Sequence, residues 1–140
     1  MPPLSTHKDL PTIMNPSTLH DPTPNGYSAV VIAPAGCRLG FVSGLGGQNE
    51  RGELSPDFAA QVAQTYRNLA TALDALGAVA AHVVKLTLFV VDHDMAKLGS
   101  LTDAVTTMFG DHLPAQTLVP VPKLAIDPML FEVEAVIALD

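Results

Sequence analysis

The stretch that decides the fold is VVKLTLFVV, residues 83–91. It is rich in β-branched and large apolar residues and contains neither glycine nor proline, so it predicts one long strand. Because successive side chains of a strand point to opposite faces, its even-numbered residues form one aliphatic face. These are Val84, Leu86, Leu88 and Val90. The other face carries Lys85 and Thr87 among apolar residues, so we expect one face beneath helices and the other partly wet.

Helical periodicity lies on both sides of this strand. Apolar residues recur at steps of four and three in the preceding segment, which makes one continuous helical stripe. The stripe consists of Phe58, Val62, Tyr66, Leu69, Leu73 and Leu76. Ser55 is the expected N-terminal cap and Gly77 the expected end of this helix. A second helix is predicted from about Asp94 to Phe109, with Gly110 as its stop.

Four further segments have the composition of strands. Tyr27–Pro34 and Leu39–Ser43 are predicted to form a hairpin that turns at Gly36. Two more strands are expected at about 116–121 and 130–139. The element order is then β-β-α-β-α-β-β, which indicates an α+β fold with a mixed sheet and both helices on one face.

The chain divides into an arm and one domain. Residues 1–25 contain six prolines among Ser, Thr and Asn, so we interpret this segment as an arm or extended loop. Residues 26–140 have the length of a single domain with its own core. The sequence leaves open whether the arm covers a pocket.

The composition favours self-association. Hydrophobic residues make up 48% of the chain and charged residues only 15%, against about 25% in an ordinary soluble domain. So few charges cover a lone molecule poorly, and a further copy of the chain would cover an apolar face. The alternative is an Ala-rich monomer with a Ser/Thr surface.

Charge and motifs exclude several classes of function. The net charge is −7 and the seven Lys and Arg residues are scattered singly, which disfavours a nucleic-acid partner. No apolar run reaches the roughly 18 residues of a membrane span, and no secretory signal is visible. The single cysteine, Cys37, fits a reducing compartment, so we expect a cytoplasmic protein. The five histidines form no metal-binding motif, and no nucleotide fingerprint appears, so neither a metal nor another cofactor is expected.

The most suggestive local pattern is the pair Glu132 and Glu134. Alternate positions on a strand place both carboxylates on one face, about 7 Å apart. A partly buried carboxyl can exchange a proton or hold a hydrolytic water. The alternative is a pair of solvated or lysine-paired glutamates near a sheet edge.

Six segments together resemble a known family. They are Phe41-Val42-Ser43-Gly44, Gln61 with Asn68-Leu69, Gly77 with Val83-Val84-Lys85, Phe109, Pro114-Ala115-Gln116-Thr117 and Glu132-Val133-Glu134-Ala135. Their joint spacing, from about Tyr27 to Leu139, is similar to the Rid (YjgF) family, also called reactive intermediate deaminase or L-PSP endoribonuclease. The resemblance implies a chorismate-mutase-like fold in a homotrimeric, barrel-type assembly. It also implies three pockets between subunits, which bind a small metabolite without a cofactor.

The resemblance also implies the site residues. Carried over position by position, the pocket would contain Tyr27, Ser43, Gly44, Thr102, Gln116, Leu118 and Glu132. Glu132 matches the glutamate that orients the attacking water. Gln116 stands where active members carry an arginine that grips the substrate carboxylate. A neutral amide holds a carboxylate roughly ten- to a hundredfold more weakly than a guanidinium does, whereas it suits an amide, hydroxyl or carbonyl group.

Other positions depart from the pattern as well. Thr102 replaces a common asparagine, Leu118 a frequent cysteine and Leu45 a usual glutamine. Arg38 and Lys123 are candidates to supply the positive charge that the family's arginine would provide at position 116. The leading hypothesis is a homotrimer that binds a carbonyl, imine or enamine metabolite and hydrolyses it with Glu132, Gln116 and Ser43. The alternative is a non-catalytic or regulatory module with the same pocket, while a ribonuclease fits the acidic charge poorly.

Overall fold

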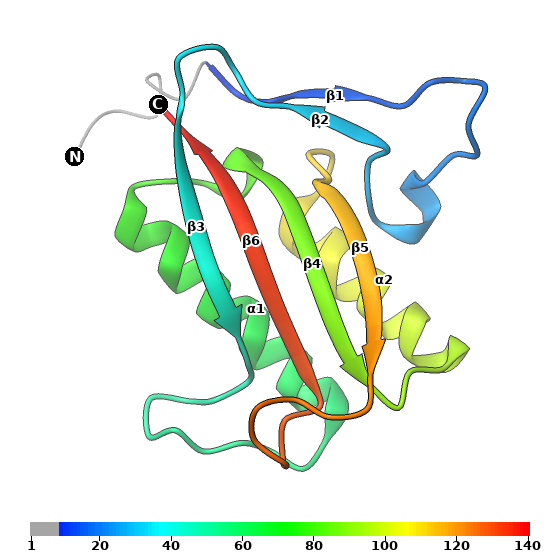
Figure 1. Cartoon of the computed structure of the whole chain (residues 1–140), viewed down its shortest axis with the longest axis vertical. Coiled ribbons are helices and arrows are strands. Elements are labelled where there is room, and N and C mark those ends of the chain that lie inside the picture. The colour runs from blue at the N-terminus through cyan, green and yellow to red at the C-terminus, as the bar shows by residue number, and fades with distance from the viewer. Residues whose placement is uncertain (1–8) are drawn as a thin grey trace.

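The computed structural model describes residues 9–140 as two layers, a sheet and a pair of helices that cover one of its faces (Figure 1). The four-stranded sheet has the order β3-β6-β4-β5, with β4 and β5 parallel and the other pairs antiparallel. The strands are β1 Thr12–Met14, β2 Val30–Ile32, β3 Arg38–Leu45, β4 Val83–Val91, β5 Ala115–Val121 and β6 Phe131–Leu139. The helices are η2 Thr23–Asn25, α1 Phe58–Leu76, η3 Ala80–His82 and α2 Met95–Phe109. The predicted α+β class, the helical layer and the mixed sheet are confirmed.

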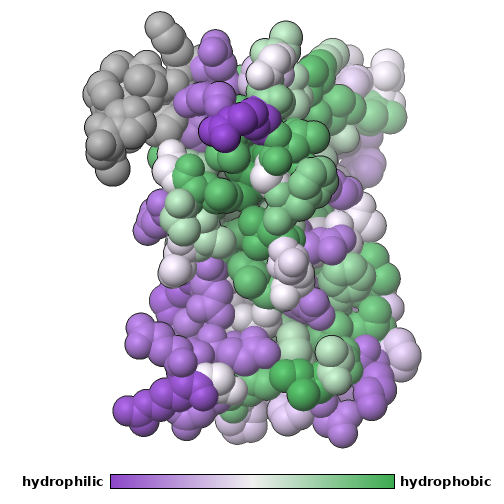
Figure 2. Space-filling view, turned by 60° about the vertical axis from the view of Figure 1, so that its left-hand side comes forward, coloured by the Kyte–Doolittle hydropathy of each residue, from purple (hydrophilic) through white to green (hydrophobic). Residues whose placement is uncertain are grey.

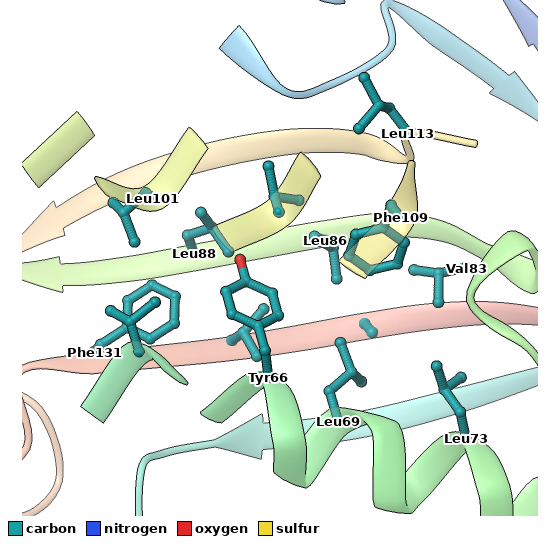
Figure 3. Close-up of a cluster of buried hydrophobic side chains, with 14 of the residues drawn as sticks. Tyr66, Leu69, Leu73, Val83, Leu86, Leu88, Leu101, Phe109, Leu113 and Phe131 are labelled. Atoms are coloured by element: carbon teal, nitrogen blue, oxygen red, sulfur yellow. The ribbon is translucent and has the colours of Figure 1, made fainter. Parts of the chain in front are cut away.

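The core lies between the sheet and the two helices (Figure 3). Leu69 of α1, Leu88 of β4 and Phe131 of β6 are completely buried. The Phe131 ring contacts Phe58 edge-on and Tyr66 at a tilt, with centroids 6.1 Å and 5.9 Å away. Aromatic pairs at this separation add to the free energy of area burial. The face of β6 opposite Glu132 and Glu134 therefore packs against the core.

Two residues of β4, Val83 and Val84, depart from the predicted alternation. The register of β4 against β6 shifts between Val83 and Lys85. As a result Val83 is buried at 2% exposure, while Val84 is only half-buried. The assignment of Val84 to the core face was wrong. The irregularity in the ladder before Lys85 turns Val83 toward the core and Val84 away from it. Leu86 and Leu88 lie on the core face as predicted.

The predicted hairpin between Tyr27–Pro34 and Leu39–Ser43, which correspond to β2 and β3, was also wrong. β2 pairs with β1, a strand inside the proline-rich arm, whereas in the described residues β3 has a ladder with β6 alone. The cause lies in Ser28, two residues before β2. Its backbone N–H donates to Pro114 O at 3.0 Å, and its hydroxyl donates to Leu113 O. These bonds hold the chain at the β5 edge, so the β1–β2 ribbon lies at the end of the sheet and not along β3 (Figure 1). The part of the arm before Asp9 lies outside the described residues.

The helix ends follow the predicted capping chemistry with one shift. Asp57, two residues after the expected Ser55, is the N-cap of α1, and its carboxylate accepts from Ala60 N at 3.0 Å. Ser55 instead accepts a hydrogen bond from Asp57 N at 3.1 Å. Asp94 caps α2 in the same way through Lys97 N. Gly77 ends α1 with a φ of 69°, a left-handed conformation that costs glycine little.

Candidate active site

Glu132 lies over a bulge in the neighbouring strand. The register of β3 against β6 shifts between Val42 and Leu45, so Ser43 and Gly44 form the irregular step. A methyl group at Gly44 would overlap the Glu132 carboxylate oxygen Oε1 and lie 2.6 Å from its Cδ. Because Gly44 has no side chain, the Glu132 carboxylate can lie across strand β3. Bulges commonly re-aim a side chain next to active sites.

Gly44 and Glu132 share a surface hollow of about 640 Å³. Its other walls come from the 45–50 loop, from α1 and from residues 125–129. Arg67 of α1 is its one lining lysine or arginine, and Glu50 is a second carboxylate. The hollow thus has charged and polar groups among apolar ones and is large enough for a small metabolite.

Two amides of α1 hold the segments around this hollow: Gln61 is completely buried, and Asn68, which lines the hollow, is half-buried. Gln61 Nε2 donates to Ser55 O and Pro128 O at 2.7 and 2.9 Å, and Gln61 Oε1 accepts from Leu130 N at 2.9 Å. Asn68 Nδ2 donates to two carbonyls of the glycine loop, those of Gly46 and Gln48, both at 2.9 Å. The resemblance named Gln61 and Asn68 without a role. Their spacing of seven, two helical turns, was the available signal that they share a face.

The second half of the expected pocket lies on β5. Gln116 pairs with Leu86, and Leu118 pairs with Leu88, in the parallel ladder. Directly paired residues of neighbouring strands project to the same face, and both leucines are buried beneath the helices. Gln116 and Leu118 therefore project to the helical side of the sheet. Gln116 Oε1 is buried and has no hydrogen-bond partner within residues 9–140, although its amide can both donate and accept.

Tyr27 and Thr102 lie near this β5 edge. Ser28 forms a parallel bridge with Ala115, which places Tyr27 beside the start of β5. The Tyr27 hydroxyl and His20 Nε2 are 2.9 Å apart and share a hydrogen bond. Thr102 Oγ1 donates to Asn25 O at 3.4 Å, so α2 contacts the turn that precedes Tyr27.

A single chain does not bring the two halves together. Glu132 pairs with Phe89 and alternates with the buried Phe131 and Val133, so it projects to the open side of the sheet. Gln116 projects to the helical side and is separated from β6 by β4. The hollow around Glu132 and Gly44 does not include Gln116.

The open face of the sheet carries polar and apolar groups side by side. Ser43, Lys85, Thr87 and Glu134 line a smaller hollow of about 240 Å³, in which Lys85 Nζ donates to Thr117 Oγ1 at 2.8 Å. Next to them Phe41 is 75% exposed. Figure 2 shows a broad hydrophobic area on this side of the molecule. Leu39, on the same strand as Phe41, is 52% exposed. Exposed apolar residues elsewhere are Met14, Val30 and Ile32 of the β1–β2 ribbon and Leu76 at the end of α1. The face has the mixed character predicted for it.

Arg38 and Lys123, the two candidates to replace the charge of the family's arginine, do not line the hollow around Glu132. Arg38, at the start of β3, donates to Asp140 O at 3.3 Å. Lys123 pairs with Asp127 at 2.9 Å on the surface. Within residues 9–140 no three His, Cys, Asp or Glu side chains cluster as a metal site would require. No helix of this region is long and apolar enough to cross a membrane.

Comparison with known proteins agrees with this architecture. The sequence model of the family described as "Endoribonuclease L-PSP" matches residues 18–139. The chain is 31% identical to the Rid-family protein YyfB of Yersinia pestis, a protein of unknown function, with a TM-score of 0.87 over 92% of this chain and 98% of that one. It is 28% identical to Rv2704 of Mycobacterium tuberculosis, from the YjgF/YER057c/UK114 family, with a TM-score of 0.62 over 92% and 99%.

The YjgF protein of E. coli is 26% identical, with a TM-score of 0.64 over 81% of this chain and 94% of that one. No curated protein sequence matches the chain significantly. The fold defined above is therefore the chorismate-mutase-like fold of YjgF proteins. The chain belongs to the Rid (YjgF, L-PSP) family.

Proposed function

We propose that the protein is a homotrimer that binds a small carbonyl, imine or enamine metabolite between subunits. With an imine or enamine it hydrolyses the C–N bond to a carbonyl compound and ammonia, without a cofactor. The observation that carries this proposal is the division of the pocket. One chain holds Glu132 and Gly44 on the open side of its sheet, and Gln116 and Leu118 on the helical side. A pocket between two subunits would bring the Glu132 side of one chain against the Gln116 side of another.

The side chains suit hydrolysis of a neutral substrate group. Glu132 provides a carboxylate that can orient and deprotonate a water as it attacks the imine carbon. The unpartnered amide oxygen of Gln116 can accept a hydrogen bond from an N–H or O–H group of the substrate, and its NH₂ can donate to a carbonyl. Because no guanidinium stands at this position, we expect neutral substrates to be preferred over 2-imino acids. We place the reaction in the cytoplasm, where the thiol of Cys37 would stay reduced.

Ammonia release tests the activity. Imines generated in situ from a panel of amino acids and their amides would be offered to the purified protein, and ammonia would be measured. We expect turnover of the amides to exceed that of the free acids, with a loss of about tenfold in Gln116→Ala, which is the size of one neutral hydrogen bond. Saturable binding that raises the melting temperature without ammonia release would favour the alternative of a non-catalytic binding module.

A mixing experiment tests whether the pocket is shared. The double variant Tyr27→Ala/Gln116→Ala and the single variant Glu132→Ala damage opposite halves. Refolded together in equal amounts, they should recover about one quarter of the wild-type activity, since random assembly unites two intact halves in that share of the pockets. A mixture no more active than its separate components would contradict a shared pocket.

Oligomeric state provides a further prediction. Phe41 is 75% exposed on the open face, and burying its ring between copies would contribute strongly to association. Phe41→Glu should therefore shift the protein from trimer to monomer in analytical ultracentrifugation at micromolar concentration. Met95→Glu replaces an equally exposed apolar residue, at 79%, on the helical layer and serves as the matched control. Wild-type protein that sediments as a monomer would rule out the assembly.

A further inference from the structure

A second hollow lies between the two helices, and Arg67 is the one residue that it shares with the hollow around Glu132. Its volume is about 490 Å³. It takes its walls from one side of α1 and one side of α2, namely Ala63, Tyr66, Arg67 and Ala70 with Asp103, Ala104, Thr107 and Met108. The small side chains of the three alanines leave this groove unfilled. Neither the proposed hydrolysis nor the open sheet face uses this groove.

Tyr66 brings a polar group into this apolar groove. Its side chain is only 6% exposed, and its hydroxyl is buried without a hydrogen-bond partner in the described part of the chain. Figure 3 shows the phenol oxygen directed from α1 toward α2. Buried hydroxyls nearly always have a partner, so an isolated one calls for an explanation. Burial raises the pKa of the Tyr66 phenol, which keeps it protonated and able to donate.

Arg67, the next residue, adds a positive charge at the rim. Its guanidinium donates to Gln64 Oε1 at 2.8 Å and forms no ion pair with another described residue. A guanidinium has five N–H donors, so several stay available for an anion. Asp103 on the opposite helix is the one acidic residue that lines the groove.

We propose that this groove binds a small apolar monocarboxylate. Its hydrocarbon part would lie against Ala63, Ala70 and Ala104, and its carboxylate would accept hydrogen bonds from the Tyr66 hydroxyl and the Arg67 guanidinium. The phenol oxygen is buried, so the carboxylate would reach it only after side chains of the groove wall move, and Met108 is an unbranched, flexible member of that wall. Because α2 also carries Thr102, a ligand here would act on the helix that contacts the turn before Tyr27.

Three probes of equal chain length separate the contributions: hexanoate, hexan-1-ol and hexylamine. Titration calorimetry with the full-length protein should show saturable binding of hexanoate, with hexan-1-ol weaker by about tenfold because it lacks the charge-assisted bonds. Tighter binding of hexylamine than of hexanoate would assign the groove to cations held by Asp103 and overturn the proposal. The absence of saturable hexanoate binding would overturn it as well.

Variants locate the binding. Ala70→Leu fills the groove and should abolish hexanoate binding, whereas Ala75→Leu adds the same side chain at another exposed position of α1 and should not. Tyr66→Phe should weaken hexanoate binding about tenfold and leave hexan-1-ol binding less affected. Arg67→Gln should act on hexanoate alone. Unchanged hexanoate affinity in Ala70→Leu or in Tyr66→Phe would refute the assigned site.

Discussion

Replacement of Gln61 by methionine is expected to lower the free energy of unfolding by about 3–6 kcal/mol. Gln61 is completely buried, and its amide makes hydrogen bonds to Ser55 O, Pro128 O and Leu130 N. Methionine fills a similar volume but can satisfy none of these groups. Each buried backbone group left without a partner costs roughly 1–2 kcal/mol, and three such groups are affected. The melting temperature should then fall by about 10–25 °C.

Gln64→Met is the matched control, since it makes the same exchange one turn further along α1. Gln64 is only half-buried and its hydrogen bonds are to the side chains of Asn68 and Arg67, which water can also satisfy. We expect a change of less than about 1 kcal/mol. Chemical denaturation of both variants measures the difference. Equal losses would mean that Gln61 acts by volume and not as a link between α1 and the two loops.

Local periodicity was sufficient to predict the helices and the long strands. The stripe through Tyr66, Leu69 and Leu73 faces the core as expected, and Gly77 ends α1 where it was predicted. The pairing of β2 was not predictable in the same way. The bonds between Ser28 and residues 113–114 join segments about 85 positions apart, and no local pattern announces them. The hairpin expected at Gly36 is the local solution that these distant bonds override.

In the candidate site, some features could be predicted from local sequence and others depend on how distant strands pair. Alternation correctly placed Glu132 and Glu134 on the open face, but they line different hollows, one with Gly44 and the other with Lys85. The division depends on the bulge at Ser43–Gly44, which is visible only once β3 is paired with β6. The family resemblance supplied Gly44 and Gln116 as site residues without stating that one chain holds them on opposite faces. That separation follows from strand register.

The second large effect is expected from Gly44→Ala. A methyl group at this position would overlap Glu132 Oε1, so the carboxylate must leave its place across β3. The flexible end of the glutamate can move at small cost, and alanine in a strand loses less backbone entropy on folding than glycine. Stability should therefore change by less than about 1 kcal/mol. The proposed hydrolysis should slow by about 10²–10⁴-fold, the usual contribution of a positioned acid–base group, and Glu132→Gln should show a similar loss.

Gly40→Ala distinguishes this effect from a general intolerance of β3 to side chains. Gly40 lies on the same strand, and a methyl group there would meet its nearest neighbours, Leu139 Cδ1 and Leu76 Cδ1, at 3.5 and 3.7 Å, ordinary contact distances. It should retain both fold and activity. Ammonia release and thermal melting on the three variants give the comparison. Wild-type rates in Gly44→Ala would show that the carboxylate reacts equally well from another position. Equal damage in Gly40→Ala would trace the loss to the strand, because Gly40 does not touch Glu132.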